Sequence, residues 1–170
     1  AGDNADGVGV LLGLARYFSQ PNAKPARTLL FVGSGGHHSS GMNGPGNLVT
    51  MNADLLKRAV LVINLEHLAQ FQIDATPVWK ANTGEEPKNF GVSNSSPALV
   101  SLVKQAAERY GFVIRPEVTN SVPGDLGGYA PLNIARIQGI HSGPLYHTSG
   151  DTLDSISVPG LEKAARFYAY

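Results

Sequence analysis

The chain has 170 residues, enough for one domain with a buried core and too few for two ordinary domains. Its 13 basic residues balance 13 acidic ones, so we expect no nucleic acid partner. Its longest apolar stretch, residues 59–65, is far shorter than the roughly 20 residues of a membrane helix, so we expect no membrane insertion. Because cysteine is absent, disulfides and thiolate metal sites are excluded, and any metal ion needs His, Asp or Glu ligands.

The first half of the chain predicts one helix and two strands. Apolar residues recur at helical spacing from Val8 to Phe18, and Pro21 follows, so a helix is expected there. The apolar runs Leu29 to Val32 and Val60 to Leu65 are typical of parallel strands buried on both faces, because neither run has a polar face to give to water. We expect these two strands to lie side by side.

The second half continues the alternation of helices and strands. The segment "SSPALVSLVKQAAERYG" predicts a helix with a serine cap, Pro97 in its first turn and a terminal glycine. "FVIRPE" and "PLNIARIQG" predict strands, Pro159 opens a last helix, and the polar stretch Asn82 to Ser96 is interpreted as a surface loop. The alternation predicts an α/β fold, a three-layer sandwich with a mixed, mainly parallel central sheet.

Residues able to bind a metal ion follow the predicted strands. His37 and His38 come after the first strand, Glu66 ends the second, and His147 lies in the loop "GPLYHTSGDTLDS". In open α/β sheets, functional side chains gather at the carboxyl ends of strands. With Asp3 at a helix start, where its alternative role is that of a helix cap, these carboxylates and imidazoles suit zinc. Patterns for a nucleophilic serine elbow, a phosphate-binding loop and HExxH are absent.

Four segments in order resemble the dizinc aminopeptidase family of zinc exopeptidases, whose relatives include glutaminyl cyclases and the noncatalytic ectodomain of transferrin receptor. "AGDNADGVGVLLGLAR" resembles the family's G-A-x-D-N-A-S-G helix opening, and "TLLFVGSGGHH" resembles its strand ending in G-E-E. "VINLEH" is similar to the I-N-L-D strand, and "YHTSGDTLDSI" to Y-H-T-x-x-D-T-x-D. The resemblance implies a zinc exopeptidase-like fold over residues 1–170, expected to lack an N-terminal part because the family's first histidine ligand has no counterpart.

The resemblance also implies roles for five residues. Asp3 takes the place of the aspartate that bridges two zinc ions, and His147 that of a terminal histidine ligand. Glu66 stands where the family has a ligand aspartate, and His38 where the second Glu of G-E-E binds zinc. His37 stands at the catalytic general base, for which imidazole is a possible substitute near neutral pH. The implied cofactor is zinc, as one or two ions.

Further residues receive expectations of their own. "PGDLGGYAP" looks like the family's S-D-H-x-x-F loop, so Asp125, together with Tyr146, is predicted to contact substrate. His67 is expected to pack on the face opposite Glu66, because side chains alternate along a strand. His141 is expected at the surface, with the pocket wall as its alternative, while Asp151 is expected to order the turn after His147.

The leading hypothesis for function is a zinc-dependent hydrolase that removes N-terminal residues from peptides. The alternative is a noncatalytic domain of the same fold that binds a protein or peptide, as in the receptor ectodomain. A third reading, acyl transfer of the glutaminyl cyclase type, has less support because nothing in the chain singles out a glutaminyl substrate. A secreted or periplasmic location is implied by the resemblance alone, and the sequence does not predict the oligomeric state.

Overall fold

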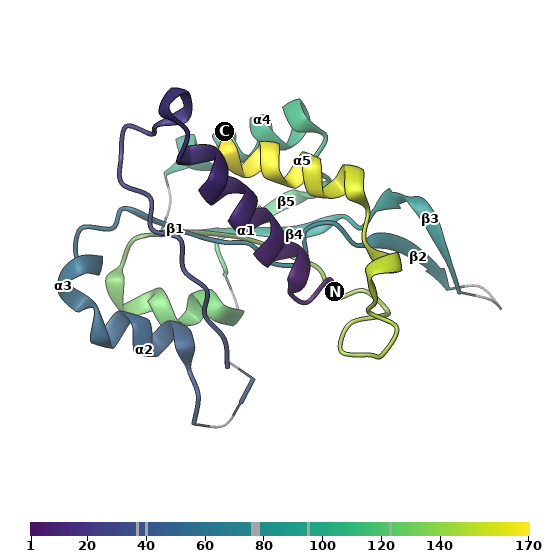
Figure 1. The fold of residues 1–170 in the computed structure, drawn as a ribbon, viewed down its shortest axis with the longest axis horizontal. Coiled ribbons are helices and arrows are strands. Elements are labelled where there is room, and N and C mark those ends of the chain that lie inside the picture. Colours follow the sequence, from purple (N-terminus) through teal and green to yellow (C-terminus); the bar gives the residue numbers. More distant parts are fainter. Residues whose placement is uncertain (37, 40, 76–78, 95, 123) are drawn as a thin grey trace.

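The computed structural model describes residues 1–36, 38–39, 41–75, 79–94, 96–122 and 124–170, and it shows a sheet between two layers of helices (Figure 1). The sheet has the order β1-β6-β4-β5. Its strands are β1 (Leu61–Asn64), β4 (Lys88–Ser93), β5 (Ile114–Thr119) and β6 (Ala135–Ile140). The pairs β1–β6 and β4–β5 are parallel, and β4–β6 is antiparallel. The predicted fold class is therefore confirmed.

The helices divide between the two faces of the sheet (Figure 1). One face carries α1 (Ala5–Phe18), α4 (Pro97–Tyr110) and α5 (Val158–Ala169). The opposite face carries α2 (Gly44–Met51), α3 (Ala53–Leu56) and the 3₁₀ segment η2 (Gly124–Leu132). Short 3₁₀ turns lie at η1 (Pro21–Ala23) and η3 (Leu153–Ser155). A separate antiparallel hairpin, β2 (Phe71–Ala75) with β3 (Trp79–Glu85), extends from one end of the molecule.

Local capping signals place α4 where the sequence predicts it. The hydroxyl of Ser96 accepts a hydrogen bond from the Leu99 N–H at 3.4 Å, which satisfies one backbone donor of the first turn. At the other end, Gly111 has φ +65°, the left-handed conformation that glycine adopts without a Cβ clash. The helix expected from residue 8 is also confirmed, and it begins slightly earlier, at Ala5.

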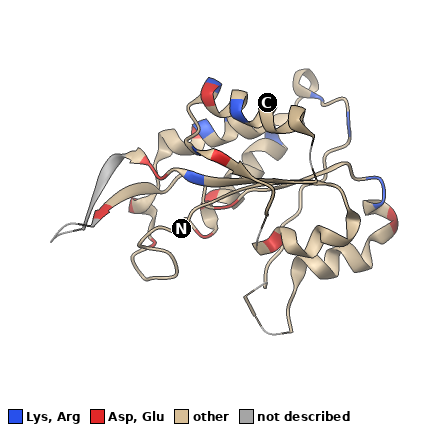
Figure 2. Cartoon of the chain, turned by 180° about the vertical axis from the view of Figure 1, so that it is seen from behind, with Lys and Arg blue, Asp and Glu red and all other residues tan. Residues whose placement is uncertain are grey.

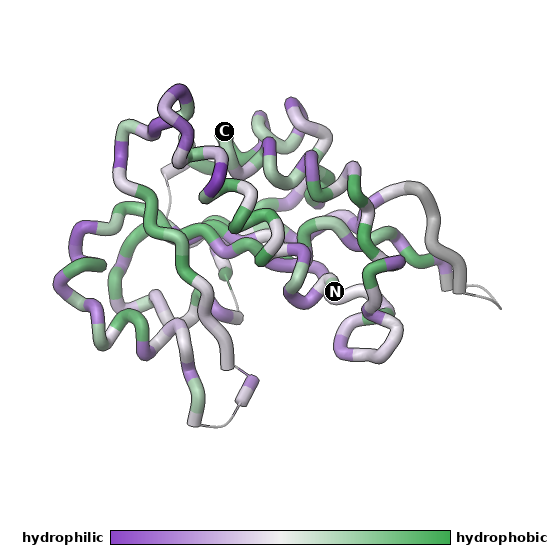
Figure 3. The backbone as a smooth tube through the Cα atoms, viewed as in Figure 1, coloured by the Kyte–Doolittle hydropathy of each residue, from purple (hydrophilic) through white to green (hydrophobic). Residues whose placement is uncertain are grey.

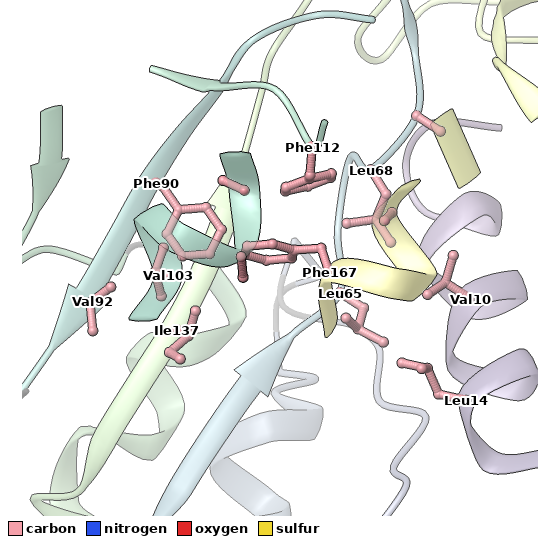
Figure 4. Close-up of a cluster of buried hydrophobic side chains, with 14 residues drawn as sticks. Val10, Leu14, Leu65, Leu68, Phe90, Val92, Val103, Phe112, Ile137 and Phe167 are labelled. Carbon is pink, nitrogen blue, oxygen red and sulfur yellow. The ribbon is translucent and has the colours of Figure 1, made fainter. Parts of the chain in front are cut away.

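The larger hydrophobic core lies between the sheet and α1, α4 and α5 (Figure 4). At its centre, the rings of Phe112 and Phe167 stack with their centroids 4.5 Å apart, and Phe90 meets Phe167 edge-on at 5.6 Å. Val10 of α1 and Leu68 of the segment after β1 belong to the same core. This packing fixes α1 relative to the end of β1, and both elements carry side chains of the candidate site.

The prediction of a buried strand at Leu29 to Val32 is wrong. This segment is an irregular stretch, seen as the green length of coil after α1 in Figure 3, and Leu30 is 56 % exposed. Among the described residues no strand pairs with it, so β1 is an edge strand and Ile63 is 41 % exposed. An apolar run forms a strand only where a neighbouring strand satisfies its backbone groups, and that pairing is not encoded in the run itself.

The interpretation of Asn82 to Ser96 as a surface loop is also wrong, because this stretch contains the end of β3 and the whole of β4, a central strand. Its polar composition is misleading. Lys88 is 1 % exposed and its ammonium lies 5.1 Å from the ring centroid of Phe112. Gly91 lets the chain approach Ser121 so closely that a Cβ would lie 2.0 Å from the Ser121 carbonyl oxygen. Long aliphatic stems and glycine allow a polar sequence to occupy a buried strand.

Charged residues of both signs are interspersed along the helices and loops (Figure 2). Lys88, by contrast, is buried in the sheet. Burial lowers its pKa to about 8, although the neighbouring carboxylates of Glu85, Asp6 and Glu86 act to raise it. Within the described ranges, no helix has the length and apolar character needed to cross a membrane.

Candidate metal centre

The start of α1 is hydrogen-bonded to the segment that follows β1. The carboxylate of Asp6 accepts hydrogen bonds through Oδ2 from the backbone N–H groups of Leu68 (2.8 Å) and Ala69 (3.0 Å). The side chain of Asn4 donates to the carbonyl of Leu65 at 2.9 Å. Burial raises the pKa of Asp6, although these N–H donors oppose the shift. The contacts hold two segments about 60 residues apart in register, so their side chains meet at one place.

Asp3 lies in the turn before α1 and is oriented by Asp151. The two carboxylate oxygens of Asp151 accept hydrogen bonds from the N–H of Gly2 (2.7 Å) and of Asp3 (3.2 Å). Asp151 was expected to order the turn after His147, and the structure shows that it also holds the Asp3 turn. With its backbone held in this way, Asp3 places Oδ2 3.0 Å from Nε2 of His147.

Glu66 follows β1 and is held by two amide side chains. Asn64 at the end of β1 and Gln138 on β6 both donate to Oε2, at 2.9 and 3.1 Å. The other oxygen, Oε1, faces Nε2 of His67 at 3.3 Å. Ligand atoms of Asp3, Glu66 and His67 all lie within 4.8 Å of one another. Hydrogen bonds of this kind, to the oxygen that points away, are typical of carboxylates that ligate a metal.

The expectation that His67 packs on the face opposite Glu66 is wrong. β1 ends at Asn64, so strand alternation no longer applies, and His67 adopts φ +52°. This left-handed conformation turns the imidazole toward Glu66 and Asp3, whose nearest oxygens are 3.3 and 4.0 Å from Nε2. Burial acts to lower the pKa of His67, but the carboxylates of Glu66 and Asp3 outweigh it and raise this pKa.

His147 and His38 lie on the outer side of the cluster. His147 also has a left-handed backbone, φ +56°, and its side chain is about half exposed. The His38 ring meets the His147 ring edge-on with centroids 5.0 Å apart. Tyr146 contacts two of the imidazoles: the centroid of its ring is 3.7 Å from that of His147 and 5.2 Å from that of His67. Burial, and then the charges of Asp3 and Glu66, raise the pKa of Tyr146.

The remaining predicted residues lie elsewhere or outside the described part. His37 is not among the described residues, so its assignment as the base rests on sequence. Asp125 is on η2 and lines a cavity of about 520 Å³, together with residues such as Met42 and Asn43 from the loop that follows His38. His141 is not at the surface as expected: its side chain is 12 % exposed and its Nε2 lies 3.5 Å from Glu86. Burial lowers the pKa of His141, against the charge of Glu86.

The clustered donors fit a zinc ion. Asp3 and Glu66 offer carboxylate oxygens, and His67 and His147 offer imidazole nitrogens, which is the ligand chemistry that zinc takes in proteins without thiolates. In addition, Nε2 of the buried His67 has no hydrogen-bond partner among the described residues. Assignment of Asp3, His38, Glu66 and His147 as ligands stays a prediction. His67 was missed because its position depends on a backbone turn that has no sequence signal.

Comparison with known proteins agrees with this reading of the fold. A family model described as Peptidase family M28 matches residues 1–170. The chain superimposes on an aminopeptidase from Aneurinibacillus sp. strain AM-1 with a TM-score of 0.71 at 23% identity, covering 98% of this chain and 37% of that one. It superimposes on BSAP, a zinc aminopeptidase from Bacillus subtilis, with a TM-score of 0.69 at 22% identity, covering 99% of this chain and 40% of that one. A comparison with curated proteins gives no significant match.

The chain therefore spans less than half of the length of either aminopeptidase structure. At these identities the likeness establishes the fold alone.

Proposed function

Because the chain belongs to peptidase family M28, we propose that it forms part of a zinc-dependent hydrolase that removes N-terminal residues from peptides. The observation that carries the proposal is the cluster of carboxylates and imidazoles at the end of β1. Asp3 has Oδ1 toward His67 and Oδ2 toward His147, so it is positioned to join two groups of donors. This division supports the bridging role that the family resemblance implies for Asp3.

In this proposal Asp3, His38, Glu66 and His147 hold one or two zinc ions. Bound zinc supplies Lewis-acid polarisation of a carbonyl and a lowered pKa for water. The chain supplies orientation: Asp151 holds the Asp3 turn through two backbone N–H groups. Preorganised ligands of this kind lower the cost of assembling the site.

His37 is assigned the role of proton acceptor, on the basis of its place in the sequence next to His38. The ring of His38 lies against that of His147, which supports the assignment of His38 to the metal centre. The cavity beside Asp125 is lined by the loop that follows His38, and we assign it to the substrate. The ring of Tyr146 packs against the imidazoles of His67 and His147, and we assign Tyr146 a role in positioning these rings beside its predicted contact with substrate.

The test measures hydrolysis of aminoacyl chromogenic amides by the full natural protein loaded with zinc. We expect turnover that a chelator abolishes and added zinc restores. His37→Ala should lose on the order of 10² to 10⁴ in rate, whereas His37→Glu should preserve or raise the rate, because a carboxylate is the family's base. Zinc-loaded protein without chelator-sensitive turnover on a broad panel, and with His37→Glu equally inert, would rule out the enzyme.

A second candidate is a noncatalytic module that binds a protein or peptide. It is favoured by one observation: Gly36-His37-His38 stands where the family has Gly-Glu-Glu, so the usual general base is replaced. This candidate predicts peptide binding without turnover, with or without zinc. Measuring binding of a peptide panel by fluorescence anisotropy beside the hydrolysis assay separates the two functions.

A further inference from the structure

His67 is a buried histidine whose ring nitrogen faces two carboxylates. Only 3 % of the residue is exposed, yet no described group forms a hydrogen bond with Nε2. Removing a polar atom from water without giving it a partner is unfavourable, so such atoms are rare in native structures and call for an explanation. Here the nearest acceptors, in Glu66 and Asp3, are 3.3 and 4.0 Å away.

The backbone conformation gives a second, independent observation. His67 has φ +52°, a conformation that only a few per cent of residues other than glycine adopt. Unusual backbone conformations of this kind concentrate at functional sites. In this conformation the imidazole lies beside Glu66, with Nε2 3.3 Å from Oε1.

The spacing of His67 and Glu66 matches that of two donors on one metal ion, and Asp3 lies slightly further away. Tetrahedral zinc with bonds of roughly 2.0 to 2.2 Å places its donors roughly 3.3 to 3.6 Å apart. The distance from Nε2 of His67 to Oε1 of Glu66 is 3.3 Å, and Asp3 Oδ1 is 4.0 Å from the same nitrogen. Oε2 of Glu66 is occupied by the amides of Asn64 and Gln138, which leaves Oε1 for a ligand.

We propose that Nε2 of His67 is a zinc ligand, completing with Asp3 and Glu66 a metal-binding group on the buried side of the site. His147 then lies beside the other carboxylate oxygen of Asp3, Oδ2. This inference rests on the zinc site of the proposed function but does not require that the protein be catalytic. It assigns a ligand that the family resemblance does not provide, since the implied set contains no residue at position 67.

The test compares zinc affinity in wild-type protein, His67→Gln and His141→Gln by competition with a chromogenic chelator. Glutamine keeps much of the size and polarity of histidine, and His141 is a matched control because it is also buried beside a carboxylate, Glu86. We expect His67→Gln to weaken zinc binding by on the order of 10²-fold, the upper end of effects measured even for supporting residues, and His141→Gln to leave it unchanged. Equal zinc affinity of all three proteins overturns the proposal.

A direct measurement on the wild-type protein keeps the proposal testable if the variant fails to fold. The imidazole nitrogen resonances of His67, observed by ¹⁵N NMR, should show coordination through Nε2 when zinc is added. No change at His67 while zinc binds elsewhere overturns the proposal. Zinc binding through His67 without peptide hydrolysis contradicts only the proposed function, so failures of the two proposals are distinguishable.

Discussion

Gly7, in the first turn of α1, is predicted to be intolerant of any side chain. A Cβ at this position would lie 2.1 Å from the carbonyl oxygen of Leu65 and 2.3 Å from Oδ1 of Asn4. Cβ atoms essentially never come within 3.0 Å of such a group, so Gly7→Ala must move α1 away from Leu65 by at least about 0.9 Å. The movement separates Asp3 from Glu66, because each belongs to one of the two segments.

The expected effects follow from that displacement. Overpacking of this kind costs roughly 1–3 kcal/mol in the free energy of unfolding. In Gly7→Ala the hydrogen bond from the Asn4 side chain to the Leu65 carbonyl should be strained as well. Zinc affinity of the variant should fall at least 10-fold, because the ligands no longer meet at one ion. Both quantities are measurable on one sample, by urea denaturation and by chelator competition.

Gly9 and Gly13 provide matched controls on the same helix, since a Cβ at either position meets nothing within 4 Å. Their replacement by alanine should stabilise α1 by roughly 0.5–1 kcal/mol and leave zinc affinity unchanged. If Gly7→Ala behaves like Gly9→Ala in both measurements, the close contact between α1 and Leu65 does not exist and the reasoning is refuted.

Three further predictions follow from the described contacts. Lys88→Met should raise the free energy of unfolding at pH 7 by up to about 3 kcal/mol, because burial lowers the pKa of Lys88 in the folded protein to about 8. Between pH 8 and 10.5 the unfolded wild-type chain binds more protons than the folded one, so wild-type stability should rise with pH in this window and that rise should be absent from Lys88→Met. Urea denaturation of both proteins across this pH range checks the prediction. Asp151→Asn should weaken zinc binding 10- to 100-fold in chelator competition, because one acceptor for the Gly2 and Asp3 N–H groups becomes a donor. Asp154 is exposed, so Asp154→Asn should leave zinc affinity unchanged, and equal affinities of the two variants contradict the prediction. Ser96→Ala should destabilise the protein by about 1 kcal/mol in urea denaturation through loss of the α4 cap, and an unchanged midpoint would show that the cap contributes nothing.

Features that depend on neighbouring residues in the chain were predictable from the sequence. The serine before α4 and the glycine after it mark its ends because their effect is local. Features that depend on distant partners were not. The run from Leu29 to Val32 has strand composition but no strand partner in the described residues, and β4 reads as a loop because its burial is imposed by surrounding elements.

The candidate site divides in the same way. The proximity of Asp3, Glu66 and His147 follows from the placement of loops at one edge of a sheet, and the structure brings them together. The position of His67 was not predictable, because it depends on a left-handed residue just beyond the end of β1. Tertiary hydrogen bonds from the N–H groups of Leu68 and Ala69 to the carboxylate of Asp6 fix that turn, and no local pattern encodes them.

The central claim is that the end of β1 and the start of α1 together hold zinc. Anomalous diffraction at the zinc absorption edge, from crystals of protein equilibrated with zinc, tests it most directly. We predict an anomalous peak within roughly 2.0 to 2.2 Å of a carboxylate oxygen of Asp3 and of an imidazole nitrogen in the cluster. Zinc peaks found only at other places on the protein, with Asp3 and Glu66 free of metal, would contradict it.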